Sequence, residues 1–145
     1  MREDVQRLLA PMDDFATHVI DLVEELPTSP VGRHIGGQLL RSGTSTAANY
    51  EEACAAESRA DFIHKMQISL KEMRESRFWL RMLKRRRWAQ AEKAAVLYAA
   101  VLYTEADELC RIFTQSVVTA KKSKRPNVLS GFLFCMLNSR FSILH

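Results

Sequence analysis

Cysteine and histidine side chains can bind metals or act as nucleophiles and bases. Their spacing therefore indicates whether the chain could hold a metal site or a catalytic site. The three cysteines, Cys54, Cys110 and Cys135, lie far apart and form no CxxC pair, which argues against a disulfide framework and a zinc site. No glutamate has a histidine three residues later, the spacing that builds metal sites in helical bundles. No phosphate-binding loop or nucleophile elbow is present. We expect a non-enzymatic protein with no catalytic residue, metal site or cofactor.

Positive charge is the more informative feature. Eight of the 21 Lys and Arg residues fall into two clusters, residues 84–87 and 121–125. Without these eight, 13 basic residues stand against 17 acidic ones, so the clusters account for the whole net charge of +4. Concentrated basic charge of this kind favours contact with nucleic acid phosphates.

The first cluster continues a row of arginines at helical spacing. Guanidinium groups one helical turn apart can bind successive phosphates, and an adjacent indole can stack on an unpaired base. The pattern therefore predicts an RNA- or DNA-binding surface. Its residues are Arg74, Arg77, Arg81, Lys84, Arg85, Arg86, Arg87 and Trp88.

A second explanation of the clusters is local. Both lie where helices are predicted to end, and cations there offset the helix dipole by about 0.3–1 kcal/mol. That effect does not require four consecutive basic residues or the row that leads to them. The alternative function is a protein–protein interaction scaffold that does not bind nucleic acid.

Four amphipathic helices must position these residues. The first is predicted at about residues 4–25, where Pro11 should bend it or delay its start. Ser29 and Pro30 form the cap and first position of the second helix, which should end near residue 57. Its predicted packing face is Ile35, Leu39, Ser42, Thr46, Tyr50 and Ala53.

Ser58 and Asp61 resemble a capping box at the start of the third helix. Its buried seam is predicted to be Phe62, Met66, Ser69, Met73, Ser76, Leu80 and Leu83. The fourth helix is predicted at about residues 91–120, with an inward face of Ala94, Tyr98, Val101, Leu102, Leu109, Ile112, Phe113 and Val117. Short connections favour antiparallel neighbours. We expect an all-α, up-down-up-down four-helix bundle over residues 1–122.

Residues 123–145 are predicted to be a separate C-terminal extension with an apolar tail, which could be a fifth helix, an interface arm or an unselected extension. No stretch there reaches the roughly 20 apolar residues that span a bilayer. The amino terminus lacks the apolar core of a signal peptide. We expect a cytoplasmic protein that does not contact membranes.

A subunit interface is predicted from two surface features. Arg41, Asn49 and Glu52 follow one another on a polar face of the second helix, for which simple solvation is the competing interpretation. Phe78 falls nearly opposite the buried seam of the third helix, so a monomer would expose it. These four residues are the predicted contacts of a homo-oligomer.

Residues 38–53, QLLRSGTSTAANYEEA, contain consecutive poor helix formers between strong helix signals. Together with residues 62–83, FIHKMQISLKEMRESRFWLRML, this segment resembles the four-helix-bundle family of the ribosomal RNA intervening-sequence proteins and the accessory proteins of diversity-generating retroelements. The family positions that recur here are Arg41, Ser42, Asn49, Glu52, Glu75, Trp79 and Leu80. Gly43 stands where alanine is usual, and residues 126–145 resemble nothing in the family.

The resemblance implies a homo-oligomeric ring, commonly a pentamer. It also implies a role beside nucleic acid or a reverse transcriptase, and no assigned enzymatic activity. Combined with the basic row, it leads us to expect a non-enzymatic, homo-oligomeric protein that binds RNA or DNA.

Overall fold

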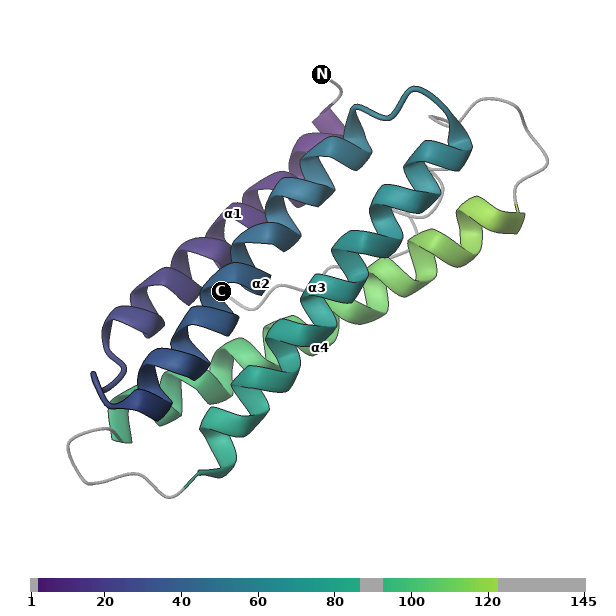
Figure 1. Cartoon of the computed structure of the whole chain (residues 1–145). Helices are drawn as coiled ribbons and strands as arrows, with labels where there is room; N and C mark the ends of the chain where they lie inside the picture. Colours follow the sequence, from purple (N-terminus) through teal and green to yellow (C-terminus); the bar gives the residue numbers. More distant parts are fainter. Residues whose placement is uncertain (1–2, 87–92, 123–145) are drawn as a thin grey trace.

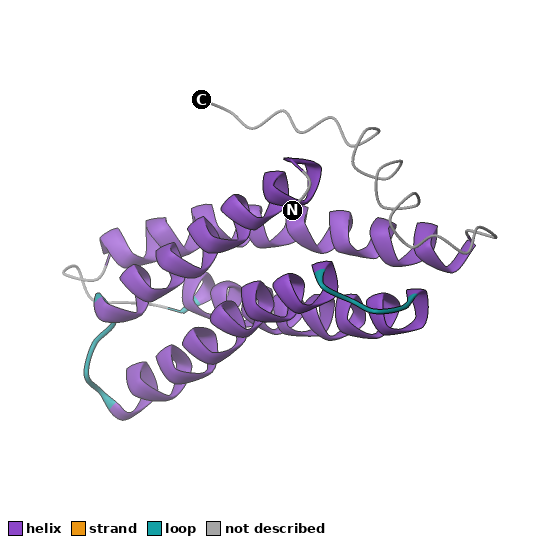
Figure 2. Ribbon diagram, turned by 90° about the horizontal axis from the view of Figure 1, so that it is seen from above, coloured by secondary structure: helices purple, strands orange, loops and turns teal. Residues whose placement is uncertain are grey.

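The computed structural model describes residues 3–86 and 93–122. Four helices occupy this range: α1 (Glu3–Glu24), α2 (Pro30–Cys54), α3 (Arg59–Arg85) and α4 (Lys93–Lys122). Successive helices run in opposite directions (Figure 1), and helices and short loops make up all of the described chain (Figure 2). The predicted up-down-up-down bundle is confirmed for these residues. The extension, residues 123–145, lies outside them.

The helix starts follow the predicted caps. The Ser29 side chain accepts a hydrogen bond from the Gly32 amide at 3.1 Å, and Pro30 opens α2. Ser58 accepts from the Asp61 amide at 3.1 Å, while the Asp61 carboxylate accepts from the Glu57 amide, one residue before the cap. These bonds satisfy amides that lack a partner in the first turn of a helix.

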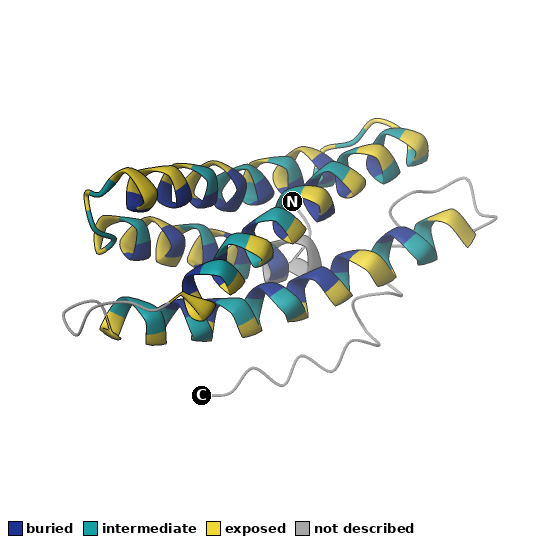
Figure 3. Cartoon of the chain, turned by 60° about the horizontal axis from the view of Figure 1, so that its bottom comes forward, coloured by how far each residue is buried: buried dark blue, intermediate teal, exposed yellow. Residues whose placement is uncertain are grey.

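The core lies along one side of each helix, as the burial colours show in Figure 3. Every residue of the packing faces predicted for the second and third helices is buried. Tyr50 and Phe113 stack face to face in this core, with ring centroids 5.6 Å apart. Periodicity alone therefore located the buried sides of α2 and α3.

Small polar side chains lie between α2 and α3. The Ser76 hydroxyl is 2.8 Å from the Ser42 hydroxyl, and Ser69 donates to the Thr46 carbonyl at 2.9 Å. All four side chains are buried, and these bonds offset the cost of burying hydroxyl groups. Serine and threonine have little volume, so the two helices can pack closely.

Gly43 has the corresponding role between α2 and α1. A Cβ atom on this residue would lie 2.8 Å from a Val19 methyl group, closer than such atoms normally approach. Gly43 therefore lies in direct contact with a neighbouring helix.

The predicted inward face of the fourth helix was partly wrong. Of the predicted residues, Val101 is 57% exposed and Ala94 is exposed as well. Leu97, which was not among them, is 70% exposed, whereas Ala99 and Ala106 are buried. The alanines occupy the contact positions and allow α4 to approach its neighbours, which turns the larger side chains outward. Because Leu97 and Val101 are this exposed, no described helix covers their side of α4.

Two further features of the helices bear on the predictions. α1 runs from Glu3 through Pro11, so proline does not delay its start. α2 ends at Cys54, about one turn earlier than predicted. None of the described helices combines the length and the apolar character needed to cross a bilayer.

Candidate nucleic-acid interface

The outward side of α3 carries a row of exposed side chains at alternating steps of three and four residues, which we call the outer stripe. Its members are Lys71, Arg74, Phe78, Arg81 and Arg85. Steps of three and four keep side chains on one face of a helix. With a rise of 1.5 Å per residue, the stripe is about 21 Å long.

Arg77, predicted to belong to this surface, is instead turned toward α4. Its guanidinium lies 2.5 Å from the Asp107 carboxylate and is half-buried. Arg111 also pairs with Asp107, and the two arginines, Arg111 foremost, lower the pKa of that carboxyl group. Arg77 is therefore engaged in an ion pair within the chain, although the single carboxylate of Asp107 compensates only one of the two arginine charges.

Lys84 occupies the edge between α3 and α4. Its ammonium group is exposed and lies 4.9 Å from the centroid of the Tyr103 ring, a cation–π contact. Lys84 and Arg85 lie in the last turn of α3, and Arg86 is exposed beside them. This placement suits both phosphate binding and the helix-dipole explanation. Arg87 and Trp88 lie outside the described residues.

Phe78 sits at the middle of the outer stripe and is 40% exposed. Its ring packs edge to face with the Trp79 ring, at a centroid distance of 4.9 Å. The guanidinium carbon of Arg81 lies 5.7 Å from the Phe78 centroid. The expectation that this aromatic side chain is exposed on one subunit is confirmed.

Three of the family positions, Arg41, Glu75 and Trp79, come together on another flank of α3, where it meets α2. Arg41 pairs with Glu72 at 2.9 Å and also with Glu75. Glu75 accepts a further hydrogen bond from the Trp79 indole at 3.4 Å, and Arg41 is the main cause of its lowered pKa. These residues join two helices of one chain, so their arrangement is structural.

The other predicted interface residues belong to the same polar face of α2. The Asn49 side chain is half-buried and donates to the Ser45 carbonyl at 2.7 Å, while Glu52 is exposed. Arg41 is thus committed to contacts within its own chain, and Glu52 is the member of this set most open to a partner.

Sequence reasoning missed Lys71 and Asp107. The signal for Lys71 was present, because it precedes Arg74 by three residues and therefore shares its face. Nothing in the sequence identifies Asp107 as the partner of Arg77, since thirty residues separate them.

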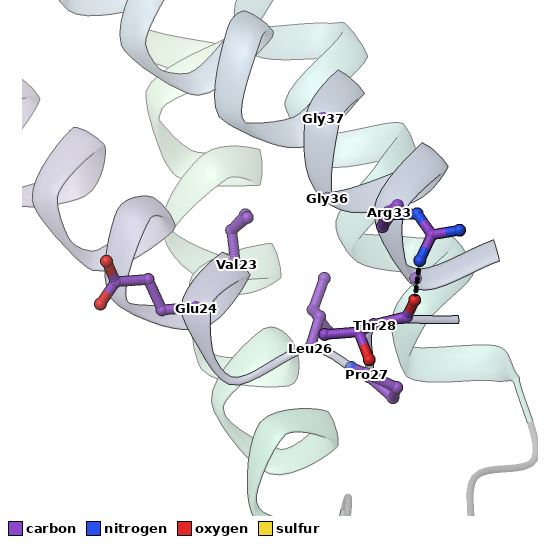
Figure 4. A pocket seen from close by; sticks show the side chains of 9 residues that line it. Val23, Glu24, Leu26, Pro27, Thr28, Arg33, Gly36 and Gly37 are labelled. Atoms are coloured by element: carbon purple, nitrogen blue, oxygen red, sulfur yellow. Dashed lines mark hydrogen bonds between the residues drawn. The ribbon is translucent and has the colours of Figure 1, made fainter. Parts of the chain in front are cut away.

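A shallow cavity of about 410 Å³ lies at the turn between α1 and α2 (Figure 4). Val23 and Leu26 supply apolar walls, and Gly36 and Gly37 form a side without bulk. The Arg33 guanidinium reaches across to the Thr28 carbonyl. This contact engages the arginine with the backbone five residues earlier. The lining of the cavity contains no cysteine, serine or histidine, and Glu24 supplies its single carboxylate.

The described residues also offer little for catalysis. Burial raises the pKa of the Cys54 thiol to about 11 and also raises that of Cys110, so both stay protonated and weakly nucleophilic near neutral pH. Within residues 3–86 and 93–122, no three His, Cys, Asp or Glu residues gather where they could hold a metal ion.

The described residues thus form a four-helix bundle with a serine-lined contact between α2 and α3 and a basic stripe on the outward side of α3. Residues 9–115 match the model of the 23S rRNA-intervening sequence protein family, and the chain belongs to that family. No curated protein matches it.

A solved relative supports this assignment. It is a protein of unknown function from the S23 ribosomal protein family of Bacteroides thetaiotaomicron, with 28% sequence identity and a TM-score of 0.53. The match covers 74% of this chain and 98% of the relative. Residues 123–145 extend beyond the stretch that the family model matches.

Proposed function

We propose that this chain is a non-enzymatic nucleic-acid-binding protein that contacts phosphates through the outer stripe of α3. The observation that carries the proposal is that Arg74, Arg81 and Arg85 share one exposed face, with no ion pair to a carboxylate among the described residues. Unneutralised guanidinium groups on one helix face attract a polyanion. The family description, which refers to 23S rRNA, favours RNA as the ligand.

The test is salt-dependent binding of a fluorescent RNA to the full chain and to the R74Q/R81Q/R85Q variant. The variant should bind more weakly, and the slope of log K against log salt should fall by about 0.7–0.9 for each phosphate that the variant no longer binds. Arg111→Gln is the matched control, because Arg111 is exposed on α4 and already pairs with Asp107. Unchanged affinity of the triple variant, or no binding by the wild type at low salt, would contradict the proposal.

We also propose that the protein forms a homo-oligomer, for which a pentameric ring is the form implied by family resemblance. Leu97 and Val101 support this, because they are apolar, exposed and one helical turn apart on α4. Glu52 and Asn49 offer a polar contact on α2. Light scattering should show a multimer that L97E/V101E shifts toward a monomer, and a monomeric wild type at tens of micromolar would refute it.

The same apolar pair favours a second candidate function, a scaffold that binds another protein, such as a reverse transcriptase, without binding nucleic acid. That candidate becomes the better account if the purified protein is an oligomer with no affinity for RNA or DNA at low salt.

A further inference from the structure

Phe78 is the aromatic member of the outer stripe. Lys71 and Arg74 precede it on the same face, and Arg81 and Arg85 follow it. A phenylalanine that is 40% exposed between two pairs of basic residues is unfavourable in water. A ligand that is both anionic and aromatic would use the ring and the charges together.

The ring is held in place by its neighbours. The Trp79 ring meets it at an interplanar angle of 76°. Trp79 is itself fixed by its indole hydrogen bond to Glu75 and by an edge contact with His34, at a centroid distance of 5.7 Å. A ring positioned on a helix in this way loses little freedom on binding, which favours affinity.

Arg81 lies over the Phe78 ring in the absence of a ligand. An exposed cation–π contact contributes less than the stacking of a base on an aromatic side chain. A base can therefore replace the guanidinium on the ring, and Arg81 is long enough to turn to the adjacent phosphate.

We propose that Phe78 is a stacking platform for an unpaired base, so that the ligand of the outer stripe is a single-stranded nucleic acid. This inference rests on the proposed function and narrows it. In a duplex, both faces of each base are covered by its neighbours, whereas an unpaired base offers a free face to an aromatic side chain. The ring reads a feature common to all bases, so sequence selectivity is weak.

The test compares Phe78→Ala and Phe78→Tyr with the wild type, using fluorescent single strands of about 12 nucleotides in RNA and DNA form and the corresponding duplexes. Phe78→Ala should weaken single-strand binding about 5- to 150-fold at each salt concentration without changing the salt slope. Duplex binding should stay the same. Phe78→Tyr should retain affinity because the ring remains.

Ile20→Ala is the matched control, because Ile20 is apolar and, like Phe78, 40% exposed, but lies on α1. It should bind every ligand as the wild type does. Both RNA and DNA single strands should lose affinity by the same factor, since they share the face of the base. A loss confined to one of them would overturn the stacking proposal.

Two other results would refute the stacking proposal and leave the proposed function standing. In the first, Phe78→Ala leaves single-strand affinity unchanged while R74Q/R81Q/R85Q still lowers it, so the stripe acts through charge alone. In the second, Phe78→Ala lowers the mass of the oligomer and weakens single strands and duplexes equally, so Phe78 is a subunit contact. Failure of the triple variant to affect binding would instead refute the proposed function itself.

Discussion

The two flanks of α3 use polar residues in opposite ways. On the flank facing α2, Glu72 and Glu75 are paired with Arg41, and Ser76 is hydrogen-bonded to Ser42. On the outer flank, Arg74 forms no ion pair with a carboxylate among the described residues. Three of the family positions, Arg41, Ser42 and Glu75, join α2 to α3 on the first flank, whereas the exposed arginines of the outer stripe lie on the second.

The residues that recur in the family and the exposed residues of the outer stripe are therefore different sets. A residue that recurs because it joins α2 to α3 says little about a ligand, even when it is charged. The outer stripe is the better guide to a ligand, because its arginines are exposed and form no ion pair with a carboxylate among the described residues.

Leucine substitutions on the two flanks of α3 should show the largest difference in stability. Ser76→Leu places bulk where the hydroxyl lies 2.8 Å from Ser42, and overpacking should lower the free energy of unfolding by about 1–3 kcal/mol. Arg74→Leu, on the exposed flank, should change it by less than about 0.5 kcal/mol. Urea unfolding measures both. Equal effects would show that the inner flank is not tightly packed.

Two glycines of α2 allow the same comparison between a tightly packed position and an open one. Gly37→Ala should stabilise by about 0.5–1 kcal/mol, since alanine favours helix and nothing lies within 4 Å of the new Cβ atom. Gly43→Ala brings a Cβ atom to 2.8 Å from Val19, so steric strain should cancel or reverse that gain. The melting temperatures of the two variants distinguish these outcomes. Equal stabilisation of both would mean that the Val19 side chain moves aside at no cost.

Acid should weaken the ion pairs that join α3 to α2 and α4, while the basic residues of the outer stripe stay charged. Arg41 lowers the pKa of Glu75 below its ordinary value of 4.5, and Arg111 and Arg77 lower that of Asp107 below 3.8. A lowered folded-state pKa contributes stability above the unfolded-state pKa that is lost as the pH falls through the folded value. Stability should therefore decline below about pH 4.5.

The measurement is the free energy of unfolding of the wild type and of E75Q/D107N between pH 7 and pH 2.5. The double variant should start less stable at pH 7 and lose less on acidification. Parallel curves for the two proteins would show that these pairs do not account for the acid response.

The smallest expected effect distinguishes phosphate binding from the helix-dipole explanation. Arg85 lies in the last turn of α3 and Arg74 lies near its middle. If the basic residues serve the dipole, Arg85→Gln should cost about 0.3–1 kcal/mol and Arg74→Gln should cost nothing. If they serve phosphates, both variants should weaken RNA binding similarly. Unfolding and binding measured on the same two variants give the answer.

Much of the fold could be predicted from the sequence, because periodicity and capping are local. The seam from Phe62 to Leu83 and the caps at Ser29 and Ser58 depend on residues within a turn or two of one another. The prediction that Val101 faces inward was wrong because α4 has apolar residues on more than one face, so periodicity alone does not identify the buried side. Only the approach of neighbouring helices selects Ala99 and Ala106 as the contacts.

The sequence by itself determined the four helices, the buried sides of α2 and α3, the family and the presence of excess positive charge. Only the tertiary structure decided which charges are available. Arg74 and Arg77 are three residues apart on the same helix, yet Arg77 meets Asp107 and Arg74 remains exposed. A helical wheel places both on one flank, but the position of α4, set by packing between residues far apart in the chain, gives only Arg77 an ion-pair partner.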